Sequence, residues 1–233
     1  MSSPLPPGQR ETADFPRFGL TQFAGRFPSQ TTRPTLQVIG LIESELSLDD
    51  PLQKLPRIEQ TSDFHCVTTW SRRSLRWSGV RFVDFFERVV RPQARPNAAA
   101  TLVALRGQDG ARTAMQLEDL LSSDVLLADT LDGAPLNVDH GAPLRLIAPQ
   151  HYGYKSIKHL SRIEFLLPSS GYRVSALTFM DHPRARVAHE ERGRYFPGRL
   201  LRYAYRPLVR GTVALFQKAS LKHQAKSGAE QPG

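Results

Sequence analysis

The stretch LDGAPLNVDHGAPLRLIAPQHYGYKSIKHLSRIEF, residues 131–165, is the most informative part of this 233-residue sequence. Its β-rich runs predict strands over 143–148 and 162–167. The loop between them contains Gly153, which permits close backbone approach, and three groups that can donate to an oxyanion: Lys155, Ser156 and Lys158. These groups could converge on a phosphate. For this stretch taken alone, a solvated loop is the default interpretation, because it contains neither a Walker motif nor GxGxxG.

A second informative stretch, HCVTTWS at residues 65–71, contains Cys66, the only cysteine of the chain. One interpretation makes Cys66 a nucleophile that is paired with a histidine. Another makes it a small buried apolar residue, which is the common fate of a lone cysteine. A third makes its thiolate a metal ligand, which requires only one protein sulfur when a cofactor supplies the other ligands. The residues alone leave all three interpretations open.

The rest of the chain predicts mainly short strands, separated by turns. We expect strands at 35–41, 58–69, 101–105, 112–117 and 125–131, and short helices beginning at Ser47 and covering 82–90 and 117–121. The strands at 101–105 and 112–117 are joined at Asp109-Gly110, a dipeptide that favours a hairpin turn. Residues 1–30 are rich in Pro, Gly, Ser and Thr, which indicates an extended N-terminal arm. Many strands and few helices favour a mixed, β-dominated α+β fold.

Composition excludes several classes of protein. Hydrophobic residues make up 40% of the chain, which excludes a wholly disordered or collagen-like protein. No run of about 18 apolar residues is present, so we expect no membrane-spanning helix. A single cysteine excludes an internal disulfide and a zinc site built on Cys-x-x-Cys. Residues 1–10 lack the pattern of a secretory or twin-arginine signal, from which we expect a cytoplasmic location.

Positive charge is concentrated near the C-terminus. The whole chain has a net charge of +9, and residues 184–226 alone contain eleven Lys or Arg against Glu190 and Glu191. Helical spacing over 199–222, interrupted by Pro207, predicts a basic, partly helical extension over 169–233 that ends in a flexible tail. Such a segment could contact an anionic membrane surface or an acidic partner, and a solvated helical face is the plainer alternative. No nucleic-acid-binding module is resembled, and we expect no nucleic-acid partner.

Together, the two informative stretches strongly resemble the sulfite oxidase family of molybdopterin enzymes, most closely its small bacterial, MsrP-like members. The resemblance runs from about Phe23 to Leu167. It implies a mixed α+β oxidoreductase domain over 31–168 with a largely β pterin-binding core. It also implies a molybdenum–molybdopterin cofactor with one cysteine ligand to the metal. Cys66 stands at that cysteine's position, so the resemblance makes it the expected catalytic and metal-binding residue.

The resemblance also implies which residues contact the cofactor. Arg145 matches the family's phosphate- or pterin-binding arginine. Ser156, Ile157 and Lys158 match the loop that holds the pterin phosphate. His140 stands where relatives place a polar pterin contact, often Asn, and Arg106 and Arg26 lie near positions of further contacts.

The implied activity is a two-electron oxygen-atom transfer on a small substrate. Sulfite is not favoured, because VTTWS follows the histidine–cysteine pair where sulfite oxidases have an Asn-Arg-Arg pattern. The length leaves no room for a haem domain, so we expect a separate electron-transfer partner, which could dock on the basic extension. We expect a chain truncated after Pro168 to keep its cofactor. The alternatives are a non-catalytic pterin-binding module and, ranked lower, a cysteine hydrolase that uses Cys66 with His65 or His140.

Overall fold

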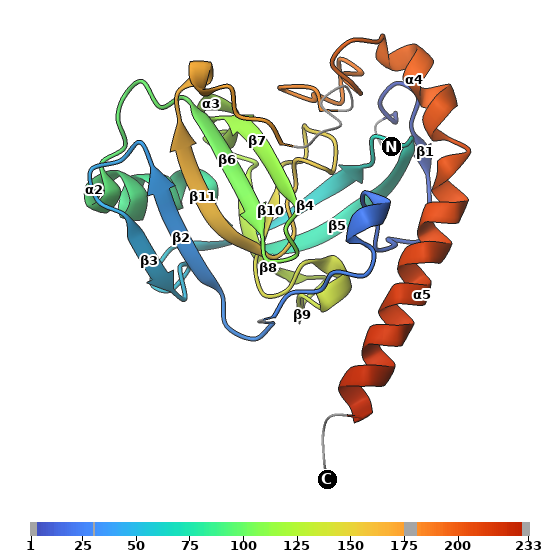
Figure 1. The fold of residues 1–233 in the computed structure, drawn as a ribbon, viewed down its shortest axis with the longest axis horizontal. Helices are drawn as coiled ribbons and strands as arrows, with labels where there is room; N and C mark the ends of the chain where they lie inside the picture. The colour runs from blue at the N-terminus through green and yellow to red at the C-terminus, as the bar shows by residue number, and fades with distance from the viewer. Residues whose placement is uncertain (1–3, 30, 175–180, 230–233) are drawn as a thin grey trace.

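Two β-sheets form the body of the protein, and a long C-terminal helix lies along one side (Figure 1). The structure is a computed structural model that describes residues 4–29, 31–174 and 181–229. Among the described elements strands outweigh helices, so the predicted α+β, β-dominated fold class is confirmed. Among the described residues, no helix combines the length and the apolar character needed to cross a membrane.

The first sheet has the order β1-β5-β8-β10, with β4 paired to β5 and β9 paired to β8. The bounds of its strands are β1 (Arg10–Glu11), β4 (Arg57–His65), β5 (Trp70–Arg81), β8 (Leu126–Leu131), β9 (Ala134–Pro135) and β10 (Arg145–Ile147). The second sheet has the order β3-β2-β11-β6-β7, in which only β2 and β11 run parallel. The bounds of its strands are β2 (Thr35–Gly40), β3 (Leu46–Asp49), β6 (Leu102–Gly107), β7 (Arg112–Gln116) and β11 (Leu160–Leu166).

One helical segment follows β5 without a break and is made of α1 (Phe82–Phe85), the π-helical η2 (Phe86–Val90) and α2 (Arg91–Ala94). The other helices are α3 (Leu117–Leu120), α4 (Gly198–Tyr205) and α5 (Leu208–Ala229), with 3-10 turns at η1 (Thr21–Phe23), η3 (Val138–His140) and η4 (Pro168–Ser170). The predicted helices at 82–90 and 117–121 and the hairpin around Asp109-Gly110 are therefore confirmed.

The main hydrophobic core lies between the two sheets. Alternating residues of the second sheet, such as Val103 and Leu105 of β6, face Val80 of β5 and Leu127 of β8. A smaller cluster covers the other face of the first sheet and contains Leu75, Trp77, Leu126, Ala128, Leu136, Ala142 and Ile147. Phe15 of the N-terminal arm packs against this second cluster. The arm therefore lies on the face of the first sheet that is turned away from the main core.

The structure differs from the sequence prediction at two elements. Ser47 does not begin a helix, because residues 46–49 form β3 and pair with β2. Leu46 and Leu48 pack against the main core, which stabilises the extended form over a short helix. The twelve-residue strand β5 was not predicted as a strand, since the arginines among residues 72–76 obscure its alternation.

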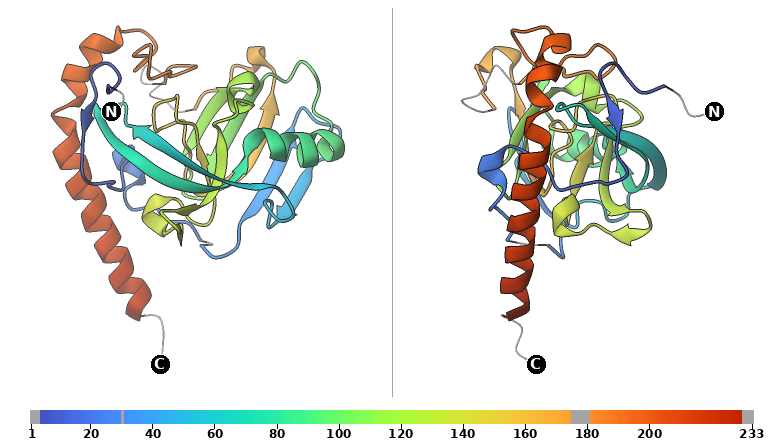
Figure 2. Two further views of the ribbon diagram at one scale, coloured as in Figure 1. Left: turned by 180° about the vertical axis from the view of Figure 1, so that it is seen from behind. Right: turned by 90° about the vertical axis from the view of Figure 1, so that its right-hand side faces the viewer.

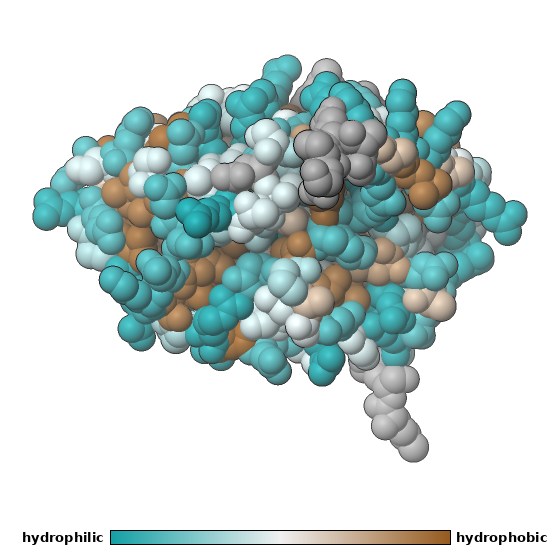
Figure 3. All heavy atoms as spheres, turned by 90° about the horizontal axis from the view of Figure 1, so that it is seen from below, coloured by the Kyte–Doolittle hydropathy of each residue, from teal (hydrophilic) through white to brown (hydrophobic). Residues whose placement is uncertain are grey.

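The two terminal segments lie against each other and against the body of the protein (Figure 2). Phe18 of the arm stacks on Phe216 of α5 with ring centroids 6.5 Å apart, and Phe27 stacks on His223 at 3.8 Å. Ser220 donates a hydrogen bond of 2.6 Å to Asp139 near η3. Seen from below, hydrophobic side chains reach the surface in separate groups among hydrophilic ones, including the side along which α5 runs (Figure 3).

Candidate cofactor-binding site

Cys66 lies in the tight turn that joins β4 to β5. Its N–H donates to Trp70 O at 2.8 Å, and its carbonyl accepts from Thr69 N at 3.1 Å. Thr69 adopts a φ of 84°, which closes the turn. The turn presents the Cys66 side chain inward, where it is 7% exposed.

The surroundings of the Cys66 thiol are apolar but carry nearby positive charge. Burial raises the pKa of the Cys66 thiol, while a contact with Thr68 Oγ1 at 3.1 Å and the cations of Arg192 and Lys158 act in the opposite direction. Within the described residues, the hydrogen bond of Cys66 Sγ goes to Thr68 and to no histidine. A nucleophile–histidine pair, which a cysteine hydrolase requires, is thus not formed.

A hydrogen-bond chain from the N-terminal arm holds this turn in place. Gln9 Nε2 donates to Cys66 O at 3.1 Å, and Ser71 Oγ donates to Gln9 Oε1 at 2.9 Å. His65 Nδ1 lies 2.8 Å from Ser71 Oγ, and burial lowers the pKa of His65, so this ring is neutral near pH 7. His65 therefore positions the turn.

The loop that contains Gly153 and residues 155–158 contacts the turn of Cys66. Gly153 N donates to His65 O at 2.8 Å, which joins the two informative stretches of sequence. A Cβ at position 153 would lie only 2.1 Å from the ring of Phe64, so this approach requires glycine. Ser156 is buried, and its Oγ accepts a hydrogen bond from Ala148 N at 3.1 Å. Ile157 packs into the main core and fixes the loop there.

Arg145 is a fully buried cation at the start of β10. Its guanidinium donates to His140 O at 2.7 Å and to Ser156 O at 3.2 Å, and it lies over the Trp77 ring at 5.0 Å. No carboxylate among the described residues forms an ion pair with it, and burial lowers its pKa to about 9. A buried, hydrogen-bonded cation without a counter-ion is a site that favours an anion.

Lys158 adds a second cation without a carboxylate ion-pair partner in the described part of the chain. Its Nζ donates to Asp139 O at 2.7 Å. Burial, reinforced by the positive charges of Arg145 and Arg17, lowers the pKa of Lys158 to about 7. Arg17, whose Nε lies 3.8 Å from Asp139 Oδ1, comes from the arm and is itself buried. Three cations thus converge where a phosphate would bind.

Arg17, Arg145 and Lys158 form what we call the cradle. The residues around it fit a polar ligand with many hydrogen-bonding groups. Arg145 Nε, His140 Nδ1 and Trp70 Nε1 are buried without a hydrogen-bond partner. The ring of Phe15 stacks on His140 with centroids 4.7 Å apart and meets Trp70 edge-on at 6.3 Å. Burial, followed by the charges of Lys158 and Arg145, lowers the pKa of His140 to about 4, so His140 is neutral and can accept or donate. These unsatisfied atoms match the polar edges and phosphate of a pterin.

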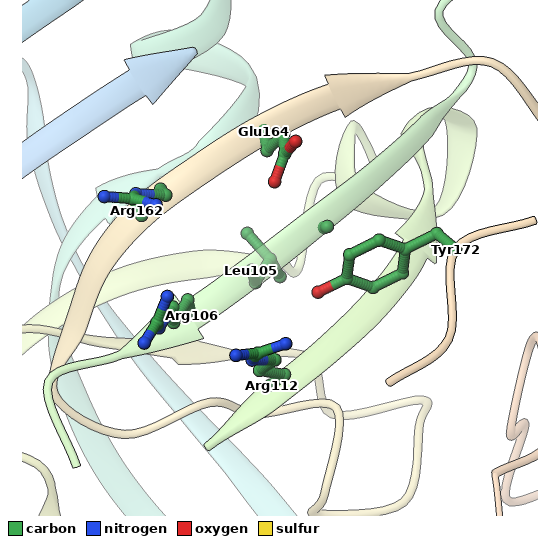
Figure 4. A pocket seen from close by; sticks show the side chains of 7 residues that line it. Leu105, Arg106, Arg112, Arg162, Glu164 and Tyr172 are labelled. Atoms are coloured by element: carbon green, nitrogen blue, oxygen red, sulfur yellow. The ribbon is translucent and has the colours of Figure 1, made fainter. Parts of the chain in front are cut away.

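Two of the residues expected to contact the cofactor lie elsewhere. The Arg26 guanidinium is exposed over the Phe23 ring at 5.0 Å, and only its carbonyl accepts from Arg17. Arg106 is exposed on the outer face of β6, where it lines a separate pocket with Arg112, Arg162 and Tyr172 (Figure 4). The structure therefore brings together Cys66, His140, Arg145, Ser156, Ile157 and Lys158 but neither of these two side chains.

Sequence reasoning also missed residues that frame the site, because no local motif marks them. Arg192 is fully buried, and it donates to Val67 O at 2.6 Å and to Pro7 O at 3.0 Å. Its guanidinium lies 4.9 Å from the ring of Tyr152, a buried phenol whose pKa is raised to about 12 by burial. Arg17 and Gln9 lie in a Pro- and Gly-rich arm, and Arg192 lies in the segment that was expected to be an appendage.

A two-sheet fold with a single buried cysteine beside buried cations is suited to a cofactor-binding domain that holds an anionic group. Residues 24–171 match the family model described as "Oxidoreductase molybdopterin binding domain", and the chain belongs to this family. The predicted membership of an MsrP-like, sulfite-oxidase-type group is thereby confirmed.

The chain is 36% identical over 167 residues to the "Uncharacterized oxidoreductase YuiH" of Bacillus subtilis, covering 70% of this chain and 80% of that one. It is 29% identical over 210 residues to the "Protein-methionine-sulfoxide reductase catalytic subunit MsrP" of Gluconobacter oxydans, covering 76% and 66%. It is 31% identical over 174 residues to the MsrP of Xanthomonas axonopodis pv. citri, covering 64% and 54%. The chain therefore spans only half to two thirds of these two reductases.

The sulfane dehydrogenase SoxCD of Paracoccus pantotrophus shares the fold, with a TM-score of 0.53 and 20% identity over 66% of this chain and 44% of that one.

Proposed function

We propose that this protein is an oxidoreductase that binds molybdenum–molybdopterin through a thiolate bond from Cys66 and transfers an oxygen atom to or from a small substrate. The observation that carries this proposal is the placement of Cys66 and the phosphate-type cradle of Arg145 and Lys158 around one set of unsatisfied polar atoms. Family membership supports the cofactor class.

The chain's own residues would hold the cofactor at both ends. Arg145, Lys158 and the arm's Arg17 would neutralise the pterin phosphate, and His140 would contact the ring system. Cys66 would give the metal its protein ligand. No group of three His, Cys, Asp or Glu side chains suited to a metal occurs in the described ranges, so the remaining ligands would come from the cofactor.

The cofactor, when bound, supplies the two-electron redox chemistry. The protein's contribution is to bind, orient and exclude water. The hydrogen bonds of Gln9, Ser71 and His65 fix the turn of Cys66, and the rings of Phe15 and Trp70 keep the cradle dry. Burial raises the pKa of the Cys66 thiol, and the positive charges of Arg192 and Lys158 partly offset this and so assist formation of the thiolate.

The names of the relatives give us a class of substrate to assay and a reason to propose an electron partner. Two of them are called protein-methionine-sulfoxide reductase catalytic subunits, so we take a methionine sulfoxide as the first substrate to assay. A catalytic subunit implies a second component, and we propose that a separate redox protein exchanges electrons with this chain.

The test is the molybdenum and pterin content of protein purified from a host that makes the cofactor. We expect about one molybdenum per chain in the wild type, and an altered molybdenum EPR signal or lost metal in Cys66→Ser. Arg145→Gln should release the pterin as well as the metal. Arg112→Gln, which removes an exposed arginine of the separate pocket, is the matched control and should retain both.

Absence of both molybdenum and pterin from the wild type would refute the proposal. Pterin bound without molybdenum-dependent activity on any sulfoxide would instead support the non-catalytic pterin-binding module.

A further inference from the structure

Exposed apolar side chains are concentrated in the C-terminal segment. Of the ten large hydrophobic side chains that are exposed in the described part of the chain, seven lie within residues 195–221. They are Tyr195, Phe196, Leu200, Tyr203, Leu208, Leu215 and Leu221, and the first four are 58–66% exposed. We call residues 195–221 the tail surface. Large exposed apolar groups that gather in one segment mark an interaction site.

The tail surface is also strongly basic. The sequence contains no Asp or Glu between Glu191 and Glu230, while Arg and Lys recur throughout it. Arg199 and Arg210 are exposed and form no ion pair with a described carboxylate. The guanidinium carbons of Arg202 and Arg206 lie 5.2 Å and 5.4 Å from the Tyr203 ring, so this exposed phenol is flanked by cations.

The body of the protein holds the tail surface with its apolar side chains outward. Tyr205 of α4 and Phe216 and Ser220 of α5 are buried, and the last two contact the arm and Asp139. In α4, Leu200 lies on the far side of the helix from the buried Tyr205, whereas in α5 Leu208 and Leu215 lie on the flank of the line through Phe216 and Ser220. The helices run along one side of the molecule (Figure 2), and these three leucines are exposed there.

We propose that the tail surface attaches this protein peripherally to an anionic membrane. Arginine and lysine are attracted to anionic lipid headgroups, and Tyr, Phe and Leu insert at the boundary between headgroups and acyl chains. The helix α4 combines these two properties, because its exposed Leu200 and Tyr203 lie close to Arg199 and Arg202. A partner recognised by its negative charge alone would leave the exposed leucines and aromatics of the tail surface without a role. This inference goes beyond the proposed redox function and is independent of it.

The test is co-sedimentation of the full chain, as purified, with vesicles in about 0.15 M salt. We expect binding to phosphatidylcholine vesicles that contain about one third phosphatidylglycerol and little binding to pure phosphatidylcholine. Arg199→Gln/Arg210→Gln should weaken binding roughly tenfold or more. Arg33→Gln/Arg112→Gln removes the same charge from exposed sites elsewhere and should leave binding within about twofold.

The apolar contribution has its own pair of variants. Leu200→Gln/Leu208→Gln should abolish binding without changing the melting temperature, since both leucines are more than half exposed. Leu41→Gln/Leu167→Gln, at exposed leucines outside the tail surface, is the control. Trp70 and Trp77 are buried and are the only tryptophans, so a Tyr203→Trp variant reports insertion by a blue shift of its emission.

Three results would overturn the proposal: no binding of the wild type to anionic vesicles, equal loss in the control variants, or no emission shift for Tyr203→Trp on vesicles that bind it. Binding to an acidic protein alone, with none to vesicles, would likewise replace it.

Discussion

The buried charge of Lys158 should have a measurable effect on the free energy of unfolding of cofactor-free protein. Burial lowers the pKa of Lys158 to about 7, whereas in the unfolded chain the pKa is near 10.5. Between these two values the unfolded state binds more protons, so the stability of cofactor-free protein rises as the pH increases from about 7 to 10.5. We predict that Lys158→Met removes this dependence and raises the free energy of unfolding of cofactor-free protein at pH 7 by about 2 kcal/mol.

The same substitution should have the opposite effect on cofactor retention. A bound phosphate compensates the Lys158 charge, so we expect Lys158→Met to lower the pterin content at least tenfold. Lys218→Met, on the exposed face of α5, is the control and should change neither quantity. Urea unfolding at several pH values, together with pterin fluorescence after denaturation, measures both. A pH-independent difference between Lys158→Met and wild type would contradict the interpretation of Lys158.

At the scale of elements, the segment after β11 supports the site through residues 181–192. Arg192 bridges the turn of Cys66, through Val67 O, and the arm, through Pro7 O. Its removal leaves two carbonyls without a donor, so we predict that Arg192→Met lowers the free energy of unfolding by about 2–4 kcal/mol. Arg194→Met, at an exposed neighbour, should have little effect.

This packing reverses an expectation from the sequence. A chain that ends at residue 168 loses Arg192 together with Ala185 and Val187, which pack on the buried Tyr152. We therefore predict that the truncated chain fails to retain molybdopterin, contrary to the view of the segment as a removable appendage. Molybdenum analysis of the truncated protein distinguishes these outcomes. Full retention of molybdenum would show that residues 169–233 are not needed to hold the cofactor.

The sequence predicts correctly those features that depend on local conformational preference. The turn at Asp109-Gly110 and the glycine at 153 have strong local preferences. Three of the residues expected to bind the cofactor, Arg145, Ser156 and Lys158, lie on one short contiguous stretch of sequence. The sequence predicts a helix from Ser47 where the structure has β3, because the stability of β3 comes from pairing with β2, which local propensity does not record. Arg17 and Arg192 were missed because only tertiary packing brings them to the site, from opposite ends of the chain.

At the scale of the whole molecule, the site joins three segments that are distant in the sequence. The arm contributes Gln9 and Arg17, the two sheets contribute the cysteine turn and the cradle, and the C-terminal segment contributes Arg192. A ligand that binds only the folded state stabilises every segment whose ordering its site requires. Bound cofactor should therefore order all three segments together, although two of them form few contacts of their own with the main core.

Limited proteolysis measures this coupling. With trypsin, we predict that the cofactor-loaded protein is cleaved at least tenfold more slowly at Arg10 and at Arg194 than cofactor-free protein, because opening either segment exposes the cradle. Cleavage at Lys222, on the outer side of α5 and away from Cys66, is the internal control and should change less. Equal protection at all three sites would indicate that the cofactor acts only through global stability. No protection at Arg10 and Arg194 would show that the two segments do not depend on the cofactor.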